Sequence, residues 1–311
     1  GEDALLAAIE STNIQIMVTQ ARVGDERPAQ TLCRLALRYF GLRFLCAYGP
    51  DVPDGVLDLD RVIRSLDAVD RSAAEQLEAA PDSGLVTYHR RGTTPARAVH
   101  RSGAGFVVAA MTYLVAARLE AGDRILSLVA ADDLKGLVTG PVAALLAGAS
   151  LESHGLFDVR AFSDALARPG RVHVVAPGWM EQALADAGLP EHVVSVVLVH
   201  EAPARFKARP PLKRPVVDVV SFGEMAVVTK ARDGRGHFAL SLDQDDGPAG
   251  VTTSRMLRVR RESDGGISFA GPASEIREFD RNGPKERLDS QEWRASGFKA
   301  DIFAGIVIGI S

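Results

Sequence analysis

The stretch Val193-Val-Ser-Val-Val-Leu-Val199 is an almost unbroken apolar and β-branched run. Such a run is typical of a strand buried on both faces of a parallel sheet, because it leaves no polar face for water. Before it, Met180–Ala187 has the pattern of a helix closed by Gly188, and Val172–Val175 predicts another strand. Strand, helix and strand in this order form a crossover unit, so the stretch predicts a parallel α/β sheet.

The same alternation extends back toward the N-terminus, which begins with a helix-like segment. The expected strands are Ile14–Val18, Leu42–Cys46, Leu85–Tyr88 and Arg124–Val129, and the expected helices are Ala29–Tyr39, Gly103–Ala121 and Gly136–Ala147. The longest apolar-rich run, Phe106–Leu119, is shorter than the roughly 20 residues that cross a bilayer. We therefore expect a core helix there and no membrane span.

The character of the sequence changes after Pro210. Pro215–Phe222 predicts one more strand, and Asp264-Gly265-Gly266 predicts a hairpin turn. Further short strands, separated by Asp/Gly turns, are expected at His237–Leu242, Arg255–Arg261 and Ile267–Ala270. The predicted fold class is α/β, with mostly parallel sheets flanked by helices over residues 1–210. A last core strand and a smaller β-rich subdomain are expected over residues 211–311.

Composition excludes several classes of protein. The chain of 311 residues is 46% hydrophobic and 24% charged, which excludes intrinsic disorder. A net charge of −4 gives no global electrostatic reason to bind nucleic acid or an anionic membrane. Cys33 and Cys46 form neither a CxxC pair nor a metal-binding spacing, and the N-terminus lacks the pattern of a secretory signal. We therefore expect a cytoplasmic protein.

Positive charge and hydroxyl groups gather in Thr87-Tyr-His-Arg-Arg-Gly-Thr-Thr-Pro-Ala-Arg-Ala-Val-His-Arg-Ser102. The stretch lies between an expected strand and a long helix, where backbone N–H groups can cradle a phosphate. Gly92 permits tight backbone geometry, Thr93 and Thr94 supply hydroxyls, and the arginines match phosphate charge. It is not a Walker loop. The alternative interpretation is a solvated basic loop in which Ser102 caps the following helix.

Gly92-Thr93-Thr94 and Pro95 match part of the phosphate-loop motif TSGTTGxPKG, and Arg97 stands roughly at its lysine. In this the chain resembles the adenylate-forming enzymes, which include acyl- and aryl-CoA synthetases, luciferases and adenylation domains. Further stretches are similar to family motifs in the same order. They are Gly122–Ser127 for GDxxLS, Leu145–Ala149 for LLxGA, Val196–Ala204 for GGAPL, Val219–Glu224 for YGxTE and Trp293–Gly297 for WxxTGD.

The resemblance implies the fold of the family's large N-terminal domain and the use of ATP and Mg²⁺, with CoA as a possible acceptor. It implies a nucleotide site made from Gly92, Thr93, Thr94, Arg97, His200, Phe222, Gly223, Glu224 and Asp301. Metal ligands are not assigned. The family's catalytic lysine lies in a small C-terminal domain, which we expect to be absent from this chain, so no catalytic residue is assigned either.

Several positions depart from the family pattern. The loop lysine and second glycine are missing, and His200-Glu201 replaces two glycines. The family's Thr-Glu pair reads Met225-Ala226, so Glu224 is the candidate to supply the lost carboxylate from a shifted position. Asp301 is displaced relative to the TGD aspartate. These changes affect groups that position and neutralise phosphates, which is where most of the catalysis in such chemistry arises.

Other polar clusters have plainer interpretations. The histidines never fall at HxxxH or HxH spacing, which argues against a metal site, and Asp132-Asp133 is expected to cap the next helix. The acidic stretch 243–246 lacks the EF-hand glycine and glutamate and favours a solvated loop over a Ca²⁺ site. Arg205–Arg214 is either a basic surface linker or a contact for a polyanion such as the CoA phosphates.

Two functions remain open at this point. One is an acyl-CoA synthetase-like protein that activates a fatty or other apolar carboxylic acid with ATP. The other is a non-catalytic homologue that binds an acyl group, acyl-CoA or nucleotide as a regulatory or scaffold module. A homodimer is a further expectation, since an apolar surface where a C-terminal domain docks in the family could be covered by a second copy.

Overall fold

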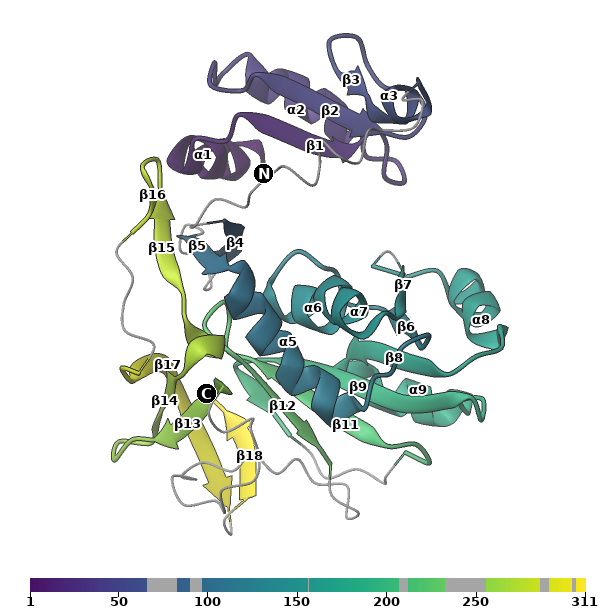
Figure 1. The fold of residues 1–311 in the computed structure, drawn as a ribbon, viewed down its shortest axis with the longest axis vertical. Helices are drawn as coiled ribbons and strands as arrows, with labels where there is room; N and C mark the ends of the chain where they lie inside the picture. The colour runs from purple at the N-terminus through teal and green to yellow at the C-terminus, as the bar shows by residue number, and fades with distance from the viewer. Residues whose placement is uncertain are drawn as a thin grey trace. The chain divides into compact units, whose positions relative to one another are not determined.

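The computed structural model describes residues 1–65, 83–89, 97–155, 157–206, 212–232, 256–285, 291–303 and 306–311. Its contacts group the chain into two compact units. Unit 1 comprises residues 1–100 and 278–286, and unit 2 comprises residues 101–277 and 287–311. This grouping differs from the sequence-based boundary after residue 210, which stays a prediction. Each unit is described by itself, with element labels as in Figure 1.

Unit 1 begins with a small α/β layer. Its elements are α1 (Glu2–Thr12), β1 (Ile16–Gln20), α2 (Pro28–Ala36), β2 (Phe44–Tyr48), β3 (Leu57–Asp58) and α3 (Leu59–Ser65). The three strands form a parallel sheet in the order β1-β2-β3. Ile9, Leu32 and Leu35 form a core between the first two helices and this sheet. The strands and helix expected at Ile14–Val18, Ala29–Tyr39 and Leu42–Cys46 are confirmed, with shifted ends.

A second sheet of unit 1 has the strand order β16-β15-β5-β4. Its strands are β4 (Gly84–His89), β5 (Arg97–Ser102), β15 (Arg277–Asp280) and β16 (Gly283–Pro284). The strand β5 is a finding that the sequence did not predict, because Arg97–Ser102 was expected to belong to a loop. Its burial explains the difference, since the side chains from Ala98 to Arg101 are buried despite the charged residues among them.

The centre of unit 2 is a six-stranded sheet in the order β12-β11-β9-β8-β6-β7. Its strands are β6 (Arg124–Ser127), β7 (Ser150–Ser153), β8 (Val172–Pro177), β9 (Val193–Glu201), β11 (Val216–Ser221) and β12 (Val227–Ala231). All neighbours are parallel except β11 and β12. The prediction of a largely parallel sheet built around Val193–Val199 is therefore confirmed, and this strand is almost entirely buried.

Helices cover both faces of this sheet, as Figure 1 shows. One face carries α5 (Gly103–Ala117), α6 (Leu134–Thr139) and α7 (Pro141–Ala147), and the other carries α8 (Val159–Ala167) and α9 (Glu181–Ala187), which follows the short η1 (Gly178–Met180). Strand side chains alternate between the two cores. Val197 and Val199 of β9 pack with α5, α6 and α7, whereas Val196 and Leu198 pack with α8 and α9.

The β-rich part of unit 2 is a five-stranded antiparallel sheet in the order β10-β18-β17-β14-β13. Its strands are β10 (Ala204–Arg205), β13 (Arg258–Arg261), β14 (Gly266–Ala270), β17 (Arg294–Phe303) and β18 (Ile306–Ile310), with η2 (Pro272–Ser274) after β14. The hairpin predicted at Asp264–Gly266 joins β13 to β14, which confirms it. Phe222, Phe269 and Phe298 lie in the core beneath this sheet.

Several helix and strand ends differ from the sequence predictions. The single helix expected at Gly136–Ala147 is two helices, because Pro141 lacks the N–H that would continue the first one. The long helix stops at Ala117, where Arg118 adopts a left-handed φ of 53°. Helix α8 and strand β12 were not predicted, and the expected strand His237–Leu242 lies outside the described residues. Among the helices that the structure describes, none is both long and apolar enough to cross a membrane.

Candidate functional site

The carboxyl edge of the six-stranded sheet is the part of unit 2 where polar side chains from several loops meet. In parallel α/β sheets, ligands bind outside the carboxyl ends of the strands. Here Glu201 ends β9, Asp133 and Lys135 follow β6, and residues 222–226 form a tight turn between β11 and β12. Gly223 has a φ of 59° in that turn, a conformation that side chains other than glycine rarely adopt.

Glu224 links this turn to the helix that follows β6. Both carboxylate oxygens lie close to the backbone N–H of Leu134, at 3.3 and 3.2 Å, and the residue is only 5% exposed. Leu134 is the first residue of α6, where backbone N–H groups have no partner inside the helix. The carboxylate therefore fixes the start of α6 against the turn between β11 and β12.

Lys135 is the cation at this edge. Its ammonium group contacts the carboxylates of Asp133 and, at 3.4 Å, Glu201. Burial opposes the charged form, but the bonds to the two carboxylates outweigh it and raise the pKa of Lys135. Asp133 also accepts a hydrogen bond from the Gly136 N–H at 3.0 Å, so the helix cap predicted at Asp132-Asp133 is confirmed for Asp133. The predicted cap at Ser102 is likewise confirmed on α5.

Phe222 points away from solvent into the core between the two sheets of unit 2. Its ring is 2% exposed and makes edge-on contacts with Phe269 and Phe298, with centroid distances of 4.8 and 5.9 Å. Its backbone N–H donates to the carbonyl of Ala226, which closes the turn. The structure thus gives the Phe222 ring a packing role in the turn that carries Gly223 and Glu224.

His200 belongs to a different cluster, on the face of the sheet covered by α8 and α9. Its Nε2 lies 2.9 Å from Oδ1 of Asp218, which is fully buried in β11. Asp218 also accepts hydrogen bonds from Arg232, which pairs in turn with Glu181 of α9. Burial favours the neutral acid, but the bonds from Arg232 and His200 outweigh it and lower the pKa of Asp218. His200 and Glu224 therefore act on opposite faces of the sheet.

The remaining residues of the predicted nucleotide site are placed as follows. Arg97 is an exposed residue of unit 1, 3.9 Å from Glu278. Asp301 lies in β17 opposite Gly309, and its carboxylate accepts a hydrogen bond from the Ser311 hydroxyl at 3.4 Å. Gly92, Thr93 and Thr94 lie outside the described residues. The structure thus brings Gly223 and Glu224 to the carboxyl edge of the sheet and assigns Asp301 to the neighbouring antiparallel sheet.

The amino end of the same sheet carries a serine, a histidine and an aspartate in a row. His173 Nδ1 lies 2.7 Å from Ser195 Oγ, and His173 Nε2 lies 2.8 Å from Asp123 Oδ2. All three residues are at most 3% exposed. A nucleophilic triad must reach substrate, and functional sites of such sheets lie at the opposite end. We therefore interpret this row as a structural network.

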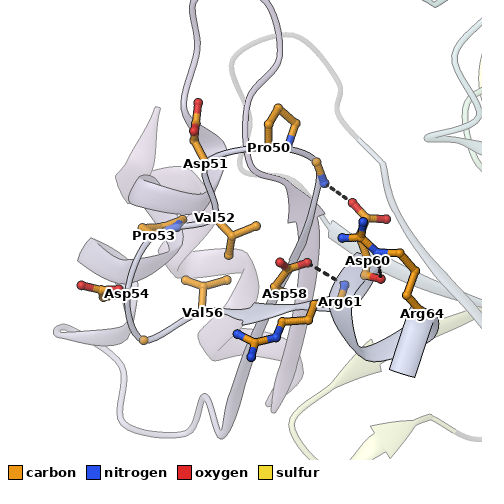
Figure 2. Close-up of a pocket in the computed structure, with 12 residues that line it drawn as sticks. Pro50, Asp51, Val52, Pro53, Asp54, Val56, Asp58, Asp60, Arg61 and Arg64 are labelled. Carbon is orange, nitrogen blue, oxygen red and sulfur yellow. Dashed lines mark hydrogen bonds between the residues drawn. The ribbon is translucent and has the colours of Figure 1, made fainter. Parts of the chain in front are cut away.

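Unit 1 contains a pocket of about 680 Å³ formed by the loop 49–56 and the start of α3 (Figure 2). Asp60 accepts a hydrogen bond from the Gly49 N–H at 2.7 Å, and Asp58 accepts one from the Arg61 N–H at 3.0 Å. Val52 and Val56 point toward each other, within the small core of the loop. Both aspartates therefore shape the loop, and no predicted site residue lies here.

Sequence reasoning missed two of the buried polar groups of unit 2. Asp218 interrupts the apolar strand Val216-Val-Asp-Val-Val-Ser221, and a charge in such a run is the signal that could have revealed the network around it. Arg101 was assigned to a basic loop, yet it is 2% exposed. Its sequence offers no periodic signal, because its partners are backbone carbonyls far along the chain.

Solved structures of acyl-CoA synthetases share this fold. The chain is 13% identical to Bacillus subtilis O-succinylbenzoate coenzyme A synthetase (MenE) in complex with ATP and magnesium ion, covering 100% of this chain and 62% of that one with a TM-score of 0.63. MatB from Rhodopseudomonas palustris without ligand is 14% identical, with coverages of 100% and 61% and a TM-score of 0.63. A variant of E. coli MenE with bound OSB-AMS is 13% identical, with coverages of 99% and 70% and a TM-score of 0.59.

These likenesses establish that the chain has the fold of the large domain of adenylate-forming enzymes. The chain spans 62% of the length of the B. subtilis synthetase. No family model matches the sequence. No curated protein matches it either. At 13 and 14% identity, the similarity shows the fold and assigns neither substrate nor activity.

Proposed function

We propose that this chain is a divergent member of the adenylate-forming enzymes that binds ATP at the carboxyl edge of its six-stranded sheet and activates a fatty or other apolar carboxylic acid. Three things support the proposal: the shared fold, the order of the degenerate motifs along the chain, and the turn 222–226. The turn 222–226 is the strongest of the three. Its glycine with positive φ and its buried carboxylate belong to the stretch that resembles the family's YGxTE motif, which supports the proposal.

The proposed nucleotide contacts are those implied by the motifs. Gly92, Thr93 and Thr94 would contact phosphates through backbone N–H groups and hydroxyls, with Arg97 as the nearest cation in sequence. Gly223 and Glu224 would contribute from the sheet edge. CoA as acceptor, a cytoplasmic location and a homodimer are parts of the same proposal that rest on the resemblance and the sequence.

Mg²⁺ usually binds through one or two carboxylates together with substrate phosphates. Within the described ranges, no cluster of three or more His, Cys, Asp or Glu residues forms a metal site without substrate. Glu224 fits the role of a single carboxylate ligand by position, and Mg²⁺ would supply neutralisation of phosphate charge there.

One observation favours the second function, a binding module without catalysis. The Phe222 ring is packed in the core and Glu224 holds α6, so both residues of the motif contribute to the fold itself. A chain that keeps these residues for stability could bind nucleotide or an acyl group without completing the reaction. Both proposals predict binding of a nucleotide or an acyl group, but only the enzyme proposal predicts that the carboxylic acid is activated.

ATP–pyrophosphate exchange with a panel of carboxylic acids, combined with calorimetry of MgATP binding, separates these proposals. The enzyme proposal predicts exchange with at least one apolar acid. Binding without exchange would favour the module, and the absence of both would overturn the nucleotide site. E224Q should weaken MgATP binding by about tenfold, equal to about 1.4 kcal/mol. E152Q is the matched control, since Glu152 lies on β7 at the far side of the sheet.

A further inference from the structure

Arg101 is a large charged side chain buried without a salt-bridging geometry to any described carboxylate. It is 2% exposed, and its guanidinium donates to four backbone carbonyl oxygens. Buried arginines are normally paired with an anion, because removing the charge from water is costly. An arginine whose planar guanidinium donates hydrogen bonds to carbonyl groups fixes the backbone segments that carry those carbonyls.

The acceptors lie on two segments that are far apart in sequence. Nη2 donates to the carbonyls of Glu224 and Met225 at 2.9 and 3.0 Å, inside the turn between β11 and β12. Nη1 donates to the carbonyls of Ala273 and Glu275, at 2.6 and 3.4 Å, around η2. One guanidinium, that of Arg101 in unit 2, therefore ties the turn that carries Glu224 to η2.

Arg294 holds the same η2 segment from a second direction. Its Nη1 lies 3.5 Å from the carbonyl of Ser274 and 3.2 Å from that of Ile276. Arg101 thus binds the carbonyls of residues 273 and 275, and Arg294 binds those of residues 274 and 276. Of the two arginines, only Arg101 also donates to the 224–225 turn, which makes Arg294 a natural control for the contribution of η2 alone.

The charge on Arg101 is retained at neutral pH. Burial lowers the pKa of Arg101 to about 10, and the charges of Glu224 and Glu275 oppose this effect. The guanidinium also lies over the ring of Phe106 in the first turns of α5, with 5.8 Å from Cζ to the ring centroid. A cation in this place is therefore held by carbonyl dipoles, an aromatic face and nearby carboxylates.

We infer that Arg101 is a positioning residue for the nucleotide site: it sets the backbone of the Glu224 turn, and through Glu224 the start of α6. The inference deepens the proposed function and rests on it for the ligand. Arg101 follows the predicted phosphate loop by a few residues in sequence and closes β5. A displacement of the 224–225 backbone would move the Glu224 carboxylate away from Leu134 and away from bound Mg²⁺ and phosphate.

The first test measures the backbone directly, without nucleotide. Hydrogen exchange is compared for wild type, R101K, R101M and R294M, with each variant first shown to be folded by thermal unfolding. R101K keeps the charge but lacks the planar guanidinium with its two NH₂ groups. Its single ammonium group can therefore bond to either the 224–225 turn or the 273–275 segment, not to both. We expect both Arg101 variants to accelerate exchange in peptides covering 222–226 and 134–136. R294M should accelerate exchange only around 273–276.

The second test measures MgATP binding by calorimetry. R101M should weaken binding by about tenfold or more, R101K by less, and R294M by no more than about threefold, because only Arg101 donates charge-assisted hydrogen bonds to the turn that carries Glu224. If R101M fails to fold, R101K carries the comparison. Equal effects of the Arg101 and Arg294 variants on exchange at 222–226 would overturn the inference. A wild-type chain that binds no MgATP would overturn the proposed function instead, and the exchange result would still decide the role of Arg101.

Discussion

The six-stranded sheet holds a histidine–aspartate pair in each half, and the two pairs are enclosed differently. At the amino end, His173 is 1% exposed, with Asp123 2.8 Å from one ring nitrogen and Ser195 2.7 Å from the other. Toward the carboxyl end, the side chain of His200 is 14% exposed and lies 2.9 Å from Asp218 through Nε2. The amino-end pair is almost completely buried. In the second pair, His200 lies one residue before the end of β9 and stays partly exposed.

The comparison shows that location, more than residue type, decides what a polar pair can do in this fold. The amino-end row has the residue types of a hydrolytic triad, yet it is sealed and lies away from the end of the sheet where ligands bind. Both aspartates bind an arginine, but Arg232, which binds Asp218 and pairs with Glu181, has a side chain only 9% exposed, whereas Arg171, which binds Asp123, is half-exposed.

The largest expected effect is that of D218A. Asp218 is fully buried and accepts hydrogen bonds from Arg232 and His200, so its removal leaves a buried guanidinium with one partner fewer. Breaking a buried pair of this kind costs about 3–5 kcal/mol. Urea unfolding at neutral pH, monitored by circular dichroism, measures the loss.

D123A is the matched comparison at the amino end. Asp123 is also buried, but its cationic partner Arg171 has a half-exposed side chain that water can solvate once the carboxylate is gone. We expect a smaller loss of about 1–3 kcal/mol, the desolvation cost of leaving His173 short of a partner. If D123A lost as much free energy of unfolding as D218A, the expected difference between the two pairs would be wrong.

The next effect is steric and concerns the surroundings of His200. A Cβ built on Gly178 would lie 2.3 Å from Nδ1 and Cε1 of His200, so the glycine makes room for the ring. G178A should therefore destabilise the chain by about 1–3 kcal/mol, as overpacking does. In an H200A background, the same substitution should cost less than about 0.5 kcal/mol. A double-mutant cycle measures the coupling, and additive losses would contradict the contact.

Much of the fold could be predicted from the sequence because its signals are local. Val193–Val199 is almost purely apolar, and the structure buries it on both faces. Ser102 and Asp133 were identified as helix caps from residue type and position alone, and both cap as expected. β5 was missed because Arg101 inside it looks like a surface residue, while its actual partners are the carbonyls of residues 224, 225, 273 and 275.

The site was harder to predict than the fold, because its geometry depends on contacts between distant segments. A motif identifies Gly223 and Glu224 but does not reveal that Phe222 faces the core or that Glu224 holds the Leu134 N–H. His200 was interpreted as added bulk in a ligand site, whereas its bond to Asp218 directs it to the α9 side of the sheet. Such facts require knowledge of which strands are neighbours.

A smaller effect is expected for S195A. The substitution removes the partner of His173 Nδ1 and should cost about 1 kcal/mol, the net contribution of one hydrogen bond. S153A, on the exposed position of the edge strand β7, should stay within about 0.5 kcal/mol. A fluorophosphonate probe provides a sharper test, because it labels activated serines that solvent can reach. Labelling of Ser195 in the folded protein would contradict a purely structural role for the amino-end row.

The smallest effect is a pH dependence that belongs to His173. Burial lowers its pKa below the ordinary value of 6.5, and the contact with Asp123 opposes this only in part. The unfolded chain therefore binds a proton more readily than the folded one, so stability falls as the pH drops below about 6.5 and levels off once the folded histidine is also protonated. A single proton limits the slope to about 1.4 kcal/mol per pH unit.

The pH dependence of the amino-end pair can be assigned by substituting His173. Asp123 has a lowered pKa because Arg171 and His173 outweigh its burial, so its own contribution is lost in a lower window, as the pH falls below 3.8. Urea unfolding of wild type and H173N between about pH 5 and pH 7.5 should show a stability loss toward acid in wild type that H173N lacks. If H173N followed the wild-type curve, the proton would be taken up elsewhere, and the closed amino-end pair would not be the group that senses it.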